Sequence, residues 1–226
     1  MKKTLLLGVL FATSVLAQAQ VEAGTFSLLP KVGVNVSRLT NSNLYTMVPH
    51  TTQAAELKSR FRVGLAAGID ADYRLLDMLS LSVGAMYSQQ GCKYKNEEYL
   101  IKDMRIRLDY VNVPIMANFY VTPSLALKAG VQLGWIVYKS VKGNVWDTVV
   151  DTETGEAKEG YTQVKFDDIA DTFGGTDFGI PVGISYDIDD VNLDLRYVFG
   201  LRGSSDALGG MKNQVIQLTL GYRIPL

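Results

Sequence analysis

Cysteine and histidine are almost missing from this sequence, which has one of each, Cys92 and His50, among 226 residues. A single cysteine excludes an intrachain disulfide and a cysteine-rich metal site, so we expect Cys92 to be a free thiol at a strand end. His50 stands near no obvious nucleophile in the sequence, which leaves a catalytic triad without visible support. Phosphate-binding glycine loops, His-x-x-x-His pairs and paired-cysteine motifs are also missing. We therefore expect no catalytic residue, no cofactor and no metal.

Long apolar runs are missing too, except at the N-terminus. Met1-Lys2-Lys3 is cationic, residues 5–16 are largely apolar, and Ala17-Gln18-Ala19 has the small-residue pattern of a cleavage site. This arrangement is typical of a secretory signal peptide. We predict that residues 1–19 are removed and that residues 20–226 form one domain. Without another run long enough for a transmembrane helix, any membrane span must be built from strands.

The sequence also has no excess of positive charge. The formal net charge is −1, and removal of Lys2 and Lys3 with no acidic residue takes it to −3. A mildly acidic chain without a basic patch is a poor nucleic-acid binder, so no nucleic acid is expected as a partner.

Strict alternation of apolar and polar residues is the strongest pattern that the sequence contains. From Val191 the apolar residues fall on every second position, and from Ile216 to Leu226 the same pattern recurs. A period of two indicates strands with two different faces, and runs of about 9–11 residues suit strands that cross a bilayer at a tilt. Eight such segments are predicted: 26–37, 61–74, 79–90, 110–121, 125–137, 178–187, 191–201 and 216–226. We predict an all-β, eight-stranded antiparallel up-and-down transmembrane β-barrel with OmpA/OmpX-like architecture.

The connections between these segments alternate in length. Those after the second, fourth and sixth segments are tight, whereas four long ones span about 39–59, 92–104, 139–173 and 202–212. This asymmetry is typical of outer-membrane barrels of Gram-negative bacteria, with short periplasmic turns and long extracellular loops. It predicts that both termini are periplasmic.

A soluble lipocalin-like barrel, with the apolar face around a ligand cavity, is the main structural alternative. The polar face is rich in Gly and Ser and lacks Glu, which suits a narrow lumen better than a water-facing surface. Aromatic residues also cluster near the strand ends, as in the two girdles of a membrane barrel. Both features favour the transmembrane barrel.

Three stretches resemble a known family: Lys31–Ser37 (KVGVNVS), Tyr87–Gly91 (YSQQG) and Leu108–Ile115 (LDYVNVPI). They are similar to the G-x-N-x-S first strand, the Y-S-Q-Q-G stretch and the L-x-Y-L-x-I-P strand of PorT-type outer-membrane β-barrel proteins of the Bacteroidota. The resemblance covers essentially the whole mature chain and implies an outer-membrane barrel. It departs at the end, where Leu226 replaces the usual closing aromatic residue. Because some members are associated with type IX secretion, the resemblance implies an accessory role in secretion as one alternative.

Functions from three classes stay open on the sequence. The first is a non-enzymatic barrel with an envelope-structural or surface-interaction role, and the second is the secretion accessory. The third is a small pore or a lipid-modifying enzyme, although eight strands leave a lumen only wide enough for side chains. Expected partners are outer-membrane lipids, the barrel-assembly machinery and, for the second function, secretion-system proteins.

Residue type alone suggests two further sites. Acidic residues crowd the predicted loop 139–173, and Asp167, Asp168 and Asp171 have the oxygens that a divalent cation takes, but without an EF-hand pattern. Pro114 and Pro181 fall inside predicted strands, where each removes a ladder hydrogen bond, so we expect bulges or bends there. The alternative is a shaped internal site between the two prolines.

Charged residues on the predicted inner face form the one site that we expect to matter structurally. The set is Lys31, Arg62, Asp70, Asp72, Arg74, Lys128, Asp187, Asp194, Arg196 and Arg223. Charges in a narrow, poorly hydrated space are tolerated only if paired. We predict a salt-bridged plug near the periplasmic end, in which Arg196 and Arg223 each contact an aspartate. The other half of the lumen is expected to be lined mainly by Gly, Ser, Asn and Gln.

Overall fold

The computed structural model describes residues 22–40, 44–47, 52, 54–94, 101–150, 157–201 and 211–226. The predicted signal peptide and His50 lie outside the described residues. No helix in these ranges is long and apolar enough to cross a membrane.

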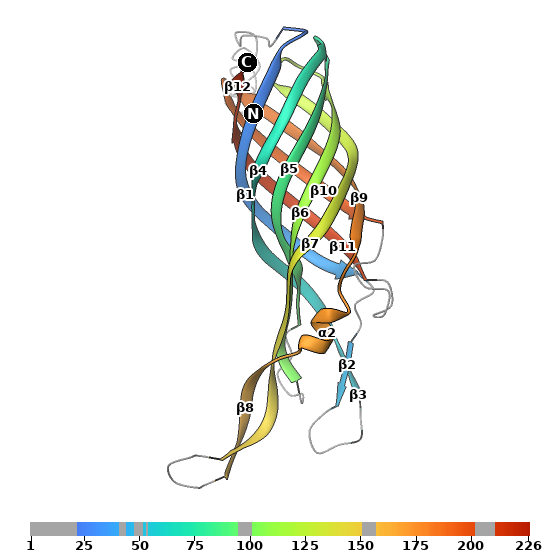
Figure 1. Cartoon of the computed structure of the whole chain (residues 1–226), viewed down its shortest axis with the longest axis vertical. Coiled ribbons are helices and arrows are strands. Elements are labelled where there is room, and N and C mark those ends of the chain that lie inside the picture. The colour runs from blue at the N-terminus through green and yellow to red at the C-terminus, as the bar shows by residue number, and fades with distance from the viewer. Residues whose placement is uncertain are drawn as a thin grey trace, which may run out of the picture.

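Eight long strands form a closed antiparallel ring (Figure 1). They are β1 (Phe26–Thr40), β4 (Ser59–Leu76), β5 (Leu79–Tyr94), β6 (Ile101–Tyr120), β7 (Leu125–Val150), β9 (Thr176–Ile188), β10 (Val191–Gly200) and β11 (Lys212–Tyr222). Each pairs with the next along the chain, and β11 pairs back onto β1 over the register Lys31↔Gly221 to Thr40↔Lys212. The short β12 (Ile224–Pro225) continues along β1. The predicted eight-stranded antiparallel barrel is confirmed.

The two ends of the barrel differ. Tight connections join β4 to β5, β6 to β7 and β9 to β10, and both termini of the described chain lie at this end, called the turn end here (Figure 1). At the opposite end, called the loop end, β7 runs on into a ribbon with β8 (Ala157–Lys165), and the hairpin of β2 (Leu44–Met47) and β3 (Ala54–Leu57) lies nearby. The short helix α2 (Asp167–Asp171) follows β8.

The prediction of a long loop at 139–173 is wrong over most of its length. β7 and β8 pair in register from Lys142↔Lys165 to Val150↔Ala157, and the rings of Trp146 and Tyr161 meet edge to face at 4.9 Å. Such aromatic cross-strand pairs stabilise a ribbon. The strands extend past the alternating segment 125–137, and the sequence beyond it, which is rich in acidic residues, has no clear alternation of apolar and polar residues.

Both inward prolines leave the strand register unshifted. On β6 the register to β5 is the same on either side of Pro114, from Val83↔Ile115 to Met86↔Asn112. On β9 the register to β7 likewise continues across Pro181, from Ala129↔Val182 to Gln132↔Gly179. The expected bulges at the prolines are therefore wrong. The missing N–H groups remove ladder bonds locally, and the flanking pairs keep the alignment.

The outer wall has an apolar belt with a definite edge toward the loop end. On β6, Val111 and Ile115 point outward and are exposed, whereas Tyr110 and Asn118 point inward and are buried. From Tyr110 toward the loop end, the inner face becomes apolar and the outer face charged. Ile106 points inward and is fully buried, and its neighbours Arg105 and Arg107 are on the outer face. An apolar outer face suits lipid, and a charged outer face with an apolar interior suits water. This reversal marks the edge of the apolar belt on the outer wall. Beyond it, toward the loop end, the outer face is suited to water.

Candidate functional site

The lumen near the turn end holds a compact set of buried charges, called the ionic plug. Its first part comprises two aspartates on β4 and β10 and three cations on β1, β7 and β10. Lys31 Nζ lies 2.8 Å from Asp70 Oδ2 and 3.2 Å from Asp194 Oδ2. The Arg196 guanidinium reaches Asp70 Oδ2 at 2.7 Å and Asp194 Oδ1 at 2.8 Å, and Lys128 also pairs with Asp194. All five residues are at most 6 % exposed.

The second part of the plug lies closer to the turn end. Arg223 Nη1 lies 3.3 Å from Asp72 Oδ2, and its Nη2 lies 3.0 Å from Asp187 Oδ2. Arg74 has no ion pair with another described residue; its guanidinium carbon lies 3.5 Å from the centre of the Tyr120 ring. A cation over an aromatic face is stabilised by the ring quadrupole, so this contact offsets part of the burial cost of Arg74.

Neutral polar side chains donate further hydrogen bonds to Asp72 and Asp187. Asn118 Nδ2 and Ser80 Oγ donate to Asp72 Oδ1 at 2.9 and 2.8 Å, and Asn192 Nδ2 donates to Asp187 Oδ1 at 2.6 Å. A buried carboxylate retains its charge only where such donors replace the water that it has lost. Each part of the plug is therefore a hydrogen-bonded network and not a set of separate ion pairs.

The alternating strand pattern explains why these charges meet. Because successive strands in the ring are antiparallel, the last inward positions of β4 and β9 lie level with the first inward positions of β7 and β10. Of the ten charges predicted to line the lumen, the structure brings together nine: Lys31, Asp70, Asp72, Arg74, Lys128, Asp187, Asp194, Arg196 and Arg223. A pocket of about 10 Å³ lies among five of these charges, Lys31, Asp70, Asp72, Lys128 and Arg223. That is no more than one water molecule needs.

Arg62 is the exception, and its predicted inward position is wrong. The register between β4 and β5 slips between Phe61 and Ala66, which marks a β-bulge beside Arg62. Arg62 donates to the carbonyl of Gln90 at 2.8 Å and lines a groove on the outer wall together with Arg107. A β-bulge reverses side-chain direction locally, and nothing in the alternation signals it.

Beyond the ionic plug, amides and hydroxyls line the middle of the lumen. Asn35 Nδ2 and Gln90 Nε2 each donate to Ser88 Oγ at 2.8 Å. This section agrees with the expected polar lining of the other half, but it does not continue to the loop end.

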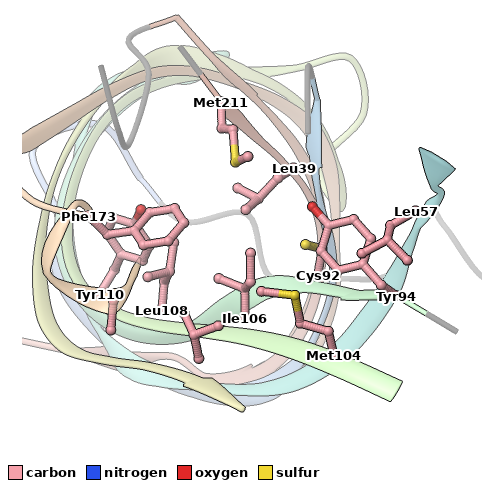
Figure 2. Packing of buried hydrophobic residues seen from close by; sticks show 12 residues of the cluster. Leu39, Leu57, Cys92, Tyr94, Met104, Ile106, Leu108, Tyr110, Phe173 and Met211 are labelled. Atoms are coloured by element: carbon pink, nitrogen blue, oxygen red, sulfur yellow. The ribbon is translucent and has the colours of Figure 1, made fainter. Parts of the chain in front are cut away.

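The loop end of the lumen is filled by an apolar cluster, which corrects that expected lining. Figure 2 shows most of the labelled side chains gathered inside the ring of strands, with Tyr94 and Leu57 at its edge. The cluster comprises Leu39, Leu57, Cys92, Tyr94, Met104, Ile106, Leu108, Tyr110, Val141, Ala170, Phe173 and Met211. Phe173, which follows α2, is 1 % exposed. The sequence carries a signal for this cluster, since Met104, Ile106 and Leu108 alternate with charged residues just before the predicted strand 110–121.

Cys92 lies within this cluster and is fully buried as a free thiol. Of the proposed cation ligands, Asp171 pairs with Lys139 at 3.0 Å, and Asp167 and Asp168 lie in the first turn of α2. Among the described residues, no three His, Cys, Asp or Glu side chains are grouped so that they could hold a metal ion.

Comparison with known proteins was made by family model and by structure. A family model described as "Outer membrane protein beta-barrel domain" matches residues 17–206. The chain belongs to this family. It is therefore a bacterial outer-membrane β-barrel protein, and the soluble lipocalin-like alternative is set aside. Comparison with curated proteins gives no match.

Several solved outer-membrane proteins are similar to this barrel. The attachment invasion locus protein Ail of Yersinia pestis is 13 % identical, with 89 % of this chain and 99 % of that chain covered and a TM-score of 0.44. Neisserial surface protein A is 16 % identical, with coverage of 88 % and 96 % and a TM-score of 0.40. OprG of Pseudomonas aeruginosa is 12 % identical, with coverage of 91 % and 98 % and a TM-score of 0.40.

Proposed function

We propose that this outer-membrane barrel has an envelope-structural or surface-interaction role and transports no solute through its lumen. The observation that carries the proposal is the double closure of the lumen, by the ionic plug near the turn end and by the apolar cluster at the loop end. A lumen filled by paired charges and packed side chains stabilises the wall and leaves no water-wide path. The functional surface is then the loop end.

A deletion strain tests this role. Loss of a wall-stabilising barrel should raise sensitivity to detergents and large antibiotics, while uptake of small solutes should stay unchanged. Reintroduced wild-type protein should restore resistance. Reduced uptake of a small solute in the deletion strain, with detergent resistance intact, would instead indicate a pore.

The proposed orientation places both termini in the periplasm and the loop end at the cell surface. It is supported by the short connections at one end and the long ones at the other. Single cysteines can test it in a Cys92→Ala background. On intact cells, a membrane-impermeant maleimide should label Tyr45→Cys, in β2, and should label Asp190→Cys, in the β9–β10 turn, only after permeabilisation. The opposite labelling pattern would reverse the orientation.

A second candidate is an accessory role in protein secretion, as the PorT-type resemblance implies. Its support is the set of stretches Lys31–Ser37, Tyr87–Gly91 and Leu108–Ile115, all of which lie within the barrel wall on β1, β5 and β6. Co-purification of secretion-system proteins with the barrel from gently solubilised membranes would favour this role. Unchanged secretion in the deletion strain would count against it.

We further infer that the protein is not an enzyme and that its contacts are with outer-membrane lipids and, during insertion, with the barrel-assembly machinery. The inference rests on the ion pairs within the plug, which engage eight of the ten predicted lumen charges. Lipid hydrolysis by the purified protein, abolished by His50→Ala, would overturn it.

A further inference from the structure

Five basic residues stand side by side on the outer wall near the loop end. The strand registers Arg60↔Lys93, Lys93↔Arg105, Arg105↔Lys142 and Lys142↔Lys165 place them in one continuous row across β4, β5, β6, β7 and β8. Residues directly opposite each other on neighbouring strands point to the same face. At about 4.8 Å between strands, this cation row spans about 19 Å.

Such a row is unfavourable by itself. Like charges directly opposite each other in a sheet repel, and none of the five forms an ion pair with another described residue. Four of the five are exposed and Lys142 is half-buried, so the row faces outward. A surface that keeps five cations in register gains stability when an anion with several negative groups lies along it.

The row borders a groove that is suited to such an anion. The groove encloses about 310 Å³, and its lining contains three members of the row, Lys93, Arg105 and Lys142, together with Arg62 and Arg107. This volume is within the range of small-ligand sites. The nearby Asp109 adds little negative charge to the groove, because it is 1 % exposed and accepts bonds from Arg107 and Tyr87.

The position of the groove identifies the class of anion. Tyr138 lines it and is 48 % exposed, and the groove lies just beyond the level at which the outer wall changes from apolar to charged. Tyrosine is enriched at membrane–water interfaces, and lipid phosphates lie at the same depth. We propose that the cation row and its groove bind the phosphate groups of anionic lipids in the surrounding leaflet. This site goes beyond the structural role and does not depend on which way the barrel is oriented.

Lipid selectivity in nanodiscs tests the proposal. The purified protein is placed in phosphatidylcholine nanodiscs with a minor fraction of spin-labelled phosphatidylglycerol, and the bound fraction is compared with that of spin-labelled phosphatidylcholine. Wild-type protein should prefer the anionic lipid. The double variant K93Q/R105Q should lower its relative affinity by about tenfold, since each basic residue near a membrane surface contributes appreciably to anionic-lipid attraction.

The matched control is R38Q/K212Q, which also removes one arginine and one lysine at the loop end, but on the β1–β11 side. It should retain the preference. Equal loss in both variants would show diffuse attraction without a site and would overturn the proposal, as would no preference in the wild type. Binding of a soluble sulfated polysaccharide that K93Q/R105Q abolishes, without any lipid preference, would assign the groove to a soluble polyanion and also overturn it. Heat-dependent gel mobility shows that each variant is folded.

Discussion

Replacement of Asp194 by asparagine is the sharpest perturbation of the ionic plug. Asp194 is fully buried, and its two oxygens receive Lys31, Lys128 and Arg196. The amide has nearly the same shape but no charge, so Lys31 and Arg196 would keep only Asp70 as a carboxylate partner, and Lys128 would lose its carboxylate. Loss of one partner from a buried ion pair costs about 3–5 kcal/mol, and we expect a decrease of this size in the free energy of unfolding.

The measurement is urea unfolding of the protein in lipid vesicles, followed by tryptophan emission. Asp190→Asn is the matched control, because Asp190 is exposed in a turn and accepts one bond from Tyr222 at 3.1 Å. We expect the control to change stability by less than about 0.5 kcal/mol.

A double variant separates charge imbalance from lost packing. The ion pair that the structure shows for Lys128 is with Asp194, so Lys128→Met in the Asp194→Asn protein removes the cation left without its carboxylate. We expect the double variant to recover part of the lost stability, with a coupling of about 0.5–3 kcal/mol. If Asp194→Asn is as stable as Asp190→Asn, or if the second change only adds to the loss, the plug is not a stabilising network.

Three further predictions concern the wall and the loop end. Leu195→Arg, on the lipid side, should cost about 2–4 kcal/mol in the same unfolding assay, whereas a cost no greater than that of Leu195→Ala would place this residue outside the apolar belt. Gly200→Ala should impair folding because the added Cβ would lie 2.4 Å from the Asn213 carbonyl oxygen, and Gly160→Ala, with nothing within 4 Å, should be tolerated. Phe173→Ala should open the apolar cluster and increase the rate at which a maleimide labels Cys92, the sole thiol. The control Tyr45→Ala should leave this rate unchanged. Equal labelling rates in the two variants would mean that Phe173 does not shield the thiol.

Most of the barrel could be predicted because the alternation of apolar and polar residues can be seen within each strand separately. A strand that separates lipid from a polar lumen must alternate apolar and polar residues. The faces of Leu195 and Arg196 can therefore be predicted from their own strand, without knowledge of the neighbouring strands. The placement of the plug charges follows from the same alternation together with strand direction. Arg62 could not be placed, because a bulge between Phe61 and Ala66 changes the register and leaves no mark in the composition.

The structure of the loop end could not be predicted from the sequence for a different reason. Strands that rise out of the apolar belt reverse their polarity, so Ile106 and Leu108 point inward while Arg105 and Arg107 point outward. Read by the rule for lipid-facing strands, this stretch resembles a charged loop. The alignment of Lys93, Arg105 and Lys142 could not be predicted either. It depends on the registers between neighbouring strands and not on any spacing within one segment.

Single-channel recording in a planar bilayer tests the central claim, that the lumen is sealed, most directly. Wild-type barrel inserted at known density should show no steady conductance, because paired buried charges fill the lumen near the turn end and apolar side chains fill it at the loop end. A stable, reproducible open level for the wild-type protein would contradict the account.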